Sequence, residues 1–366
     1  MSGVGAAGTT YDGLAGALLR DSTGVRQHLD TLLQQASSGR VADTYAGLGA
    51  GAGTSLAIAP QIAAQQAISK NIDAASAQMQ VAQTALQQIS AVASTFYADT
   101  NNLNGLDPSV VDSTAQAARQ ALQQVAGLLD STDGGLYVFA GQDSGNPPVP
   151  DPGGILGSGF FTQIQSAVAG LSGSGAAGVI ASTLATAASN ASGTTPFSPA
   201  LSQPAAVVQA QLPSVTTGAG QQVTTGIAAS ANAFVASTGT STTGSYMRDV
   251  LRALATIGSL SSGQVNDAGF GAVVQDAHTS LGGALTALNQ DAGALGNVQS
   301  TLQTEQSTLG ASTTALQTQL AGAQDADMAT TLSQITQTET RLQASYQMIA
   351  GLQSYSLAKF LTPQVG

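Results

Sequence analysis

Residues that could do chemistry are few and widely spaced in this chain. The two histidines, His28 and His278, lie far apart, and neither has further metal-ligating side chains spaced around it. Asp325 and Asp327 form a close acidic pair, but a role at a helix N-terminus fits them better than cation binding. The chain has no cysteine, so it forms no disulfide and no thiolate metal site. We therefore predict no catalytic residue, no metal site and no cofactor.

Two short patterns resemble ligand or modification motifs only loosely. Glycines alternate at positions 47, 49, 51 and 53, but the Gly-Lys-Ser/Thr ending and the preceding strand of a phosphate loop are missing. A flexible connector is the better interpretation of this stretch. Asn190-Ala191-Ser192 fits the N-glycosylation acceptor pattern, which is short enough to occur by chance.

Composition excludes several classes of partner. Only 8% of the 366 residues are charged, and the formal net charge is -11. Nine Lys and Arg scattered along the chain form no basic face, so we predict no nucleic-acid partner. No stretch approaches the roughly 20 uninterrupted apolar residues of a membrane helix, so we predict no membrane span. The first residues also lack the basic and apolar regions of a Sec signal peptide.

The strongest pattern is a long apolar heptad near each end of the chain. A repeat of about 3.5 residues keeps one stripe of a helix against a partner helix, so the two rows are expected to pack together. The fold class predicted is mainly α, with long antiparallel coiled-coil helices from both termini. The N-terminal row is Ile68, Ile72, Ala75, Met79, Ala82, Leu86, Ile89, Ala93 and Phe96. The C-terminal row is Ala277, Leu281, Ala284, Leu288, Leu295, Val298, Leu302, Leu309 and Leu316.

The middle of the chain has a different composition. Between residues 143 and 244 the only charged residues are Asp143 and Asp151, and Gly, Ser, Thr, Ala and Pro dominate. A β-rich central insert domain is favoured over a disordered tract, which usually carries high net charge. Part of it, Ala176 to Ala191, could equally be a short Ala-rich helix. The domains predicted are a terminal helix and connector (1–55), two parts of a helical domain (56–135 and 245–323), the outward-facing central insert (136–244) and a terminal helix (324–366).

The outermost helices carry a candidate site for assembly. About four large seam residues on the first helix, near 2 kcal/mol each when buried, do not offset the cost of ordering some 23 residues at about 1 kcal/mol apiece. We therefore favour contacts between subunits over an intramolecular core for the apolar residues at both ends. These candidate interface residues are Leu18, Val25, Leu29, Leu32, Leu342, Ile349, Leu352 and Leu357.

Five short segments in this order resemble the flagellin superfamily, and within it the hook–filament junction subgroup. The resemblance covers the helical ends, about two thirds of the chain, whereas Ala42 to Gly53 departs from the acidic, Pro-containing segment of the family. The segments are Leu32-Leu33-Gln34-Gln35-Ala36-Ser37-Ser38-Gly39-Arg40-Val41, Leu136-Tyr137-Val138-Phe139-Ala140-Gly141, Asp325-Ala326-Asp327-Met328-Ala329, Leu342-Gln343-Ala344-Ser345 and Ser356-Leu357-Ala358-Lys359-Phe360-Leu361.

The resemblance implies an extracellular structural subunit of the bacterial flagellum that self-associates in a ring or tube. It implies neighbours in the flagellar axis, namely a hook-side junction protein and flagellin, and an export chaperone. Export would go through the flagellar type III apparatus, which fits the missing Sec signal. The alternative within the family is a flagellin that builds the filament itself. A coiled-coil surface adhesin is a more distant alternative, and an enzyme in the central segment is disfavoured because that segment has few groups for catalysis.

Overall fold

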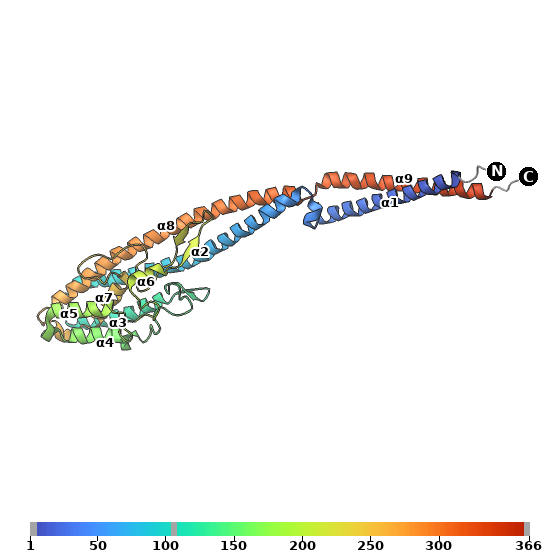
Figure 1. Cartoon of the computed structure of the whole chain (residues 1–366). Helices are drawn as coiled ribbons and strands as arrows, with labels where there is room; N and C mark the ends of the chain where they lie inside the picture. The colour runs from blue at the N-terminus through green and yellow to red at the C-terminus, as the bar shows by residue number, and fades with distance from the viewer. Residues whose placement is uncertain (1–5, 104–107, 362–366) are drawn as a thin grey trace, which may run out of the picture. The chain divides into compact units, whose positions relative to one another are not determined.

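The computed structural model describes residues 6–103 and 108–361, except for the side chains of residues 6–15, 102 and 352–361. The described chain is mainly helical (Figure 1). Its internal contacts divide it into two compact units, one made of residues 1–64 with 311–366 and the other of residues 65–310. Helices α2 (Gly51–Asn102) and α8 (Phe270–Gln324) contribute residues to both units.

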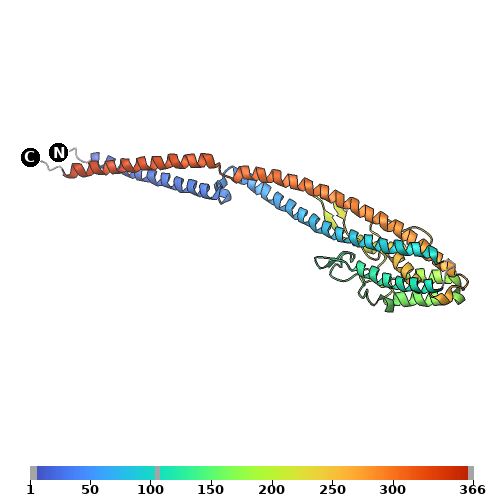
Figure 2. The same cartoon turned by 180° about the vertical axis from the view of Figure 1, so that it is seen from behind.

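The first unit contains the two outermost helices, α1 (Ala6–Ser38) and α9 (Met328–Leu361), and the 3-10 turn η1 (Tyr45–Leu48). Helices α1 and α9 lie side by side in both views (Figures 1 and 2). Gly39 ends α1 with a φ of +70°, a conformation that favours glycine. The backbone then pairs with the turn before α9, where the amide of Val41 donates to the carbonyl of Gln324 at 2.8 Å.

Asp327 begins α9, as the sequence predicts for the acidic pair. Its Oδ1 accepts hydrogen bonds from the amides of Ala329 (3.0 Å) and Thr330 (3.2 Å), and its Oδ2 accepts one from the Thr330 hydroxyl at 2.7 Å. Asp325 does not share this capping role, because it forms the isolated backbone bridge with Arg40 instead. The N-cap interpretation is thus confirmed for Asp327.

In the second unit, α2 and α8 run antiparallel. Asp73 contacts Gln306, Ser90 contacts Asn289, and the ring of Tyr97 stacks on His278 at 4.1 Å between centroids. Residue numbers therefore rise along α2 while they fall along α8. Both apolar heptad rows contribute buried side chains to one core, so the expected packing of the two rows and the mainly α fold class are confirmed.

The rest of the second unit covers this helical pair. Helix α7 packs against α3, α4 and α5, and all of its residues are buried. Strands β1 and β2 form one antiparallel hairpin and β3 and β4 another. The bounds are α3 Pro108–Leu129, β1 Thr132–Asp133, β2 Leu136–Tyr137, η2 Ile155–Gly157, α4 Gly159–Ala169, α5 Leu171–Ala188, α6 Ala205–Ala210, β3 Ser214–Thr216, β4 Gln222–Thr224, α7 Tyr246–Gly258 and η3 Ser262–Gln264.

The β-rich character expected for residues 136–244 is not what the structure shows. This segment contains three helices, α4, α5 and α6, and its strands are only two or three residues long. Phe160, Phe161, Ile164 and Val168 are buried at helical spacing, so packing overrides the strand preference of the Val, Thr and Phe residues. The alternative of a short Ala-rich helix is confirmed by α5.

Among the described residues, one helix is long and apolar enough to cross a membrane by length and composition alone. It is α5, and its backbone leaves the helical conformation at Gly175, where φ is +66°. The uninterrupted remainder is shorter than the roughly 20 residues that a membrane helix needs. Its buried side chains include Val179 and Thr183, and it packs on α4 and α7.

Candidate assembly surface on the terminal helices

The seam between α1 and α9 is a heptad seam in which polar and apolar residues alternate. On α9 the inward-facing positions recur at steps of four and three. Every second one is a buried hydroxyl residue: Thr331, Thr338 and Ser345. The Ser345 hydroxyl has no hydrogen-bond partner in the described structure. Half of the α9 stripe therefore adds little apolar burial, and the pair formed by α1 and α9 is held by a narrow core.

The structure places six of the eight predicted interface residues in this seam. Leu32 is 2% exposed, and Leu18, Val25, Leu29, Leu342 and Ile349 are half-buried. Helix α9 is the element that packs on α1, so these side chains face the partner helix of their own chain. The side chains of Leu352 and Leu357 lie outside the described residues. A role in contacts between subunits stays a prediction for all eight.

A second set of apolar side chains beside the seam is exposed. Leu19, Leu33, Leu332 and Tyr346, which we call the outer flank, are 55%, 47%, 53% and 41% exposed. Arg26 joins the two helices on this side, because its guanidinium donates to the Tyr346 hydroxyl and lies 5.8 Å from the ring centroid. The sequence analysis missed the outer flank. The sequence does contain a signal for it: Leu19 and Leu33 are two heptads apart, as are Leu332 and Tyr346. Such spacing places both residues of a pair on the same face of their helix.

The residues that the sequence singled out for possible chemistry are either exposed or take part in contacts that hold the fold together. His28 is exposed, and Nδ1 of His278 lies 2.9 Å from the Thr100 hydroxyl beside the stacked Tyr97 ring. The Asn190 side chain accepts a hydrogen bond from Arg248 at 2.6 Å. The described residues contain no group of three or more His, Asp or Glu side chains that could hold a metal ion.

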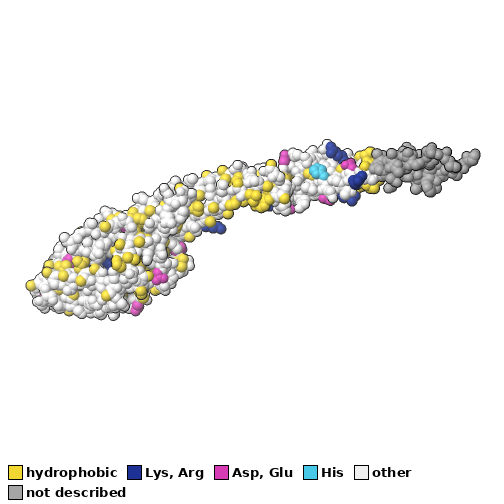
Figure 3. All heavy atoms as spheres, viewed as in Figure 1, with side chains coloured by type: hydrophobic (Ala, Val, Ile, Leu, Met, Phe, Trp, Pro, Cys, Tyr) yellow, Lys and Arg dark blue, Asp and Glu magenta, His cyan; other side chains and the backbone are white. Residues whose placement is uncertain are grey.

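The alternating glycines at positions 47, 49, 51 and 53 do not form a phosphate loop in the described structure. The glycines fall at η1 and at the start of α2, and Gly51 is packed close to the carbonyl of Ala323. Most of the surface that Figure 3 shows is uncharged, and charged side chains of both signs lie close together near one end of the coloured surface.

Comparison with known families agrees with this architecture. Residues 14–144 match the family model of the bacterial flagellin N-terminal helical region. Residues 279–361 match the model of the bacterial flagellin C-terminal helical region. The first match contains the described part of α1 from residue 14, together with α2, α3 and the first hairpin, and the second covers most of α8 and all of α9. A comparison with curated proteins gives no match.

Together the two matches cover more than half of the chain, one at each end of the sequence. The chain belongs to the flagellin superfamily. This is a family of structural, non-enzymatic proteins that polymerise into the extracellular bacterial flagellum, so the chain is a structural subunit of that organelle.

Proposed function

We propose that this chain is the subunit that joins the hook to the filament, and that its terminal helices assemble with neighbouring copies into a ring or tube. The observation that carries the proposal is the outer flank. Four apolar side chains, each at least two fifths exposed, lie beside a seam whose α9 side is half hydroxyl residues. An apolar surface at such a seam is what a neighbouring helix would cover.

Energetics supports assembly of these helices. A leucine side chain contributes about 2 kcal/mol when it is fully buried. The apolar seam residues of α1, most of them half-buried, contribute less than this in the isolated chain. Covering Leu19 and Leu33 with a neighbouring copy adds the burial that the isolated pair lacks. The described seam residues and the outer flank would then be buried together in the assembly.

The hairpin segment Leu136–Gly141 supports the junction subgroup over the major filament protein. This segment resembles the Tyr-x-Phe-Ser/Ala-Gly element of junction proteins, and here it has a defined role in the fold. Phe139 is fully buried, Ala140 forms a backbone bridge with Ala228, and Gly141 has a φ of +63°. The segment thus joins the family helices to the central segment, residues 136–244, which we propose faces outward.

The proposal defines the partners. In the assembled flagellum the chain would contact the hook-side junction protein on one side and flagellin on the other. Before export a chaperone would cover the apolar terminal surface, and export would use the flagellar type III route without a Sec signal. Nucleic acid and membrane lipid are not among the proposed partners.

Deletion of the gene in the native host tests the proposal. The cells and the medium are compared by electron microscopy, and we expect bare hooks on the cells with filament protein shed into the medium. Hooks that keep their junction but carry no filament would instead assign the chain to the filament itself. Flagella of normal form and motility would contradict both flagellar roles.

Complementation of the deletion strain tests the outer flank. The double variant L19Q/L33Q is expected to be exported but to restore motility poorly, because each subunit loses two apolar contacts of about 2 kcal/mol. V207Q is the matched control, since Val207 is a similarly exposed apolar side chain (41%) outside the terminal helices. Equal motility of the two variants would show that the outer flank takes no part in assembly.

A further inference from the structure

A buried irregular segment, residues 227–245, runs between β4 and α7. We call it the strap. Ile227, Ala228, Ala229 and Ala231 belong to the core, and Asn232 is 2% exposed. Apart from isolated bridges at Ala228 and Ala231, the strap has no helix or strand of its own to satisfy its buried backbone amides. These amides therefore need side-chain acceptors from the helices beneath.

One carboxylate on α8 supplies the acceptors for the first half of the strap. Asp291 is 1% exposed, and its oxygens accept the amides of Ala233 (3.1 Å), Phe234 (2.7 Å) and Val235 (2.9 Å). The Tyr246 hydroxyl donates to it at 2.9 Å. Burial, and then the charge of Asp291, raise the pKa of Tyr246 well above its ordinary value, so the phenol stays a donor. Hydrogen bonds to an ionised acceptor are among the strong ones in proteins.

The first half of the strap also pairs with the residues that directly follow the hairpin formed by β1 and β2. The amide of Ala229 donates to the carbonyl of Phe139 at 2.9 Å, and Ala228 bridges to Ala140. A cleft of about 400 Å³ with no charged side chain lies between this hairpin, α2 and the start of the strap; Tyr137, Gln78 and Ile227 are among its lining residues. Ile227, the first residue of the strap, lines this cleft, so a movement of the start of the strap would change the width of the cleft.

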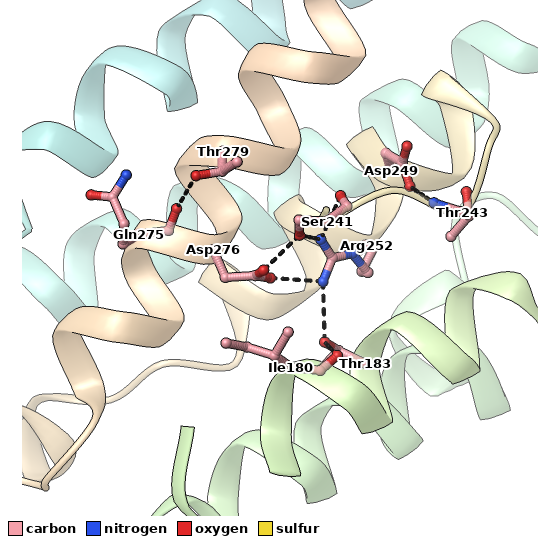
Figure 4. Close-up of polar contacts among 9 residues, drawn as sticks. All are labelled: Ile180, Thr183, Ser241, Thr243, Asp249, Arg252, Gln275, Asp276 and Thr279. Atoms are coloured by element: carbon pink, nitrogen blue, oxygen red, sulfur yellow. Dashed lines mark hydrogen bonds and ion pairs between the residues drawn. The ribbon is translucent and has the colours of Figure 1, made fainter. Parts of the chain in front are cut away.

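A separate cluster holds the second half of the strap (Figure 4). Arg252 of α7 pairs with Asp276 of α8 at 2.8 Å, and the Ser241 hydroxyl donates to Asp276 at 2.6 Å. Arg252 also donates to Ser241 and reaches the Thr183 hydroxyl of α5 at 3.4 Å. Asp291 takes no part in this cluster, so the two anchors share no side chain.

We propose that the strap is a two-latch device in which Asp291 is the latch for residues 233–235, and the Arg252–Asp276 pair is the latch for the segment around Ser241 and its contact with α5. Beside these latches, Arg248 donates to the carbonyl of Ser230 at 3.0 Å, and Asp249 accepts the amide of Thr243 at 2.7 Å. When the contacts of one latch break, only the part of the strap that this latch holds is released. Opening of the Asp291 latch releases the hairpin and widens the uncharged cleft, while α7 stays packed on α8.

Hydrogen exchange of the full chain, read by mass spectrometry, tests the two latches. D291N is expected to speed exchange in peptides containing residues 229–235 and 136–142 by about tenfold or more, because the charged acceptor of three amides is lost. Peptides from α3 and from residues 239–243 should keep their wild-type rates. D276N is the matched control, and it should speed exchange at residues 239–243 while leaving residues 233–235 unchanged.

Y246F is a milder second variant that keeps the carboxylate and removes one of its four donors. It should speed exchange at residues 229–235 by less than D291N does, and it decides the question if D291N does not fold. Unchanged exchange at residues 233–235 in the folded variants, or faster exchange throughout residues 65–310, would overturn the proposal. The same would follow if D291N and D276N produced one common exchange pattern.

Discussion

At the scale of single residues, Arg248 shows how this protein uses its few charges. The side chain is 6% exposed, and its guanidinium lies 5.1 Å from the centre of the Phe197 ring. Burial lowers its pKa to about 10, so it is charged at neutral pH and needs acceptors. The acceptors are three backbone carbonyls and one amide side chain, on Ser230 (3.0 Å), Ala187 (2.9 Å), Ser189 (3.2 Å) and Asn190 (2.6 Å).

Such residues could not be predicted from the sequence. The apolar stripe of Val250, Leu251, Leu254 and Ile257 identifies α7 as a buried helix. It does not reveal that Arg248 and Arg252 are buried too, because their acceptors come from other parts of the chain. Those of Arg248 are backbone carbonyls and the Asn190 side chain, and the main one of Arg252 is the carboxylate of Asp276 on α8. The same holds for Asp291, whose three amide partners lie 56 to 58 residues earlier in the chain.

Replacing Arg248 with methionine should destabilise the chain by about 3 kcal/mol, because the substitution leaves buried carbonyl oxygens without donors. The check is urea unfolding followed by circular dichroism. K70M is the control, since Lys70 is exposed on α2, and surface changes of this kind are usually within about 0.5 kcal/mol. Equal midpoints for R248M and K70M would show that the Arg248 contacts do not contribute to stability.

At the scale of elements, the helices at both ends and α7 could be predicted from the sequence, whereas in the central segment α5 was predicted only as an alternative and α4 and α6 were not predicted. The end helices have heptad patterns and clear stop signals, such as Gly39. Helix α5 mixes alanines, which favour a helix, with Gly, Ser and Thr, which do not, and α4 contains Phe, Ile and Val, which also suit a strand. Contacts with α7, which lies far along the chain, stabilise them.

The start of α9 gives a pH-dependent prediction. Hydrogen bonds from Thr330, and a further one from the Ala329 amide, lower the pKa of Asp327. Because the pKa of this carboxyl is lowered in the folded state, the charged cap stabilises the helix start at pH values above about 4, the ordinary pKa of an aspartate. This stabilisation is lost as the pH falls through the lower pKa of the folded state. D327A should therefore speed amide exchange at residues 329–330 at pH 7, relative to wild type.

The difference should shrink in acid, where wild-type Asp327 becomes protonated. D325A is the control, because the carboxylate of Asp325 is not an acceptor of the two amides that Asp327 caps. A rate ratio between D327A and wild type that stays constant from pH 7 to acid would contradict a role for the charged cap.

At the scale of the whole molecule, sequence alone indicated the family, and two family models support it over residues 14–144 and 279–361. The candidate site could be predicted only in part. Heptad spacing found the seam of α1 and α9, but a heptad does not state whether its partner helix belongs to the same chain or to a neighbour. The exposed outer flank became visible only once the seam residues were seen to face each other within one chain.

The position of the subunit in the flagellum tests the central claim most directly. An epitope inserted after Ser192, in an exposed turn of the central segment, can be located with gold-labelled antibody by electron microscopy on cells whose motility is unchanged by the tag. We predict gold confined to a narrow band between hook and filament. Gold along the whole length of the filament would contradict the junction assignment and make the chain a filament flagellin.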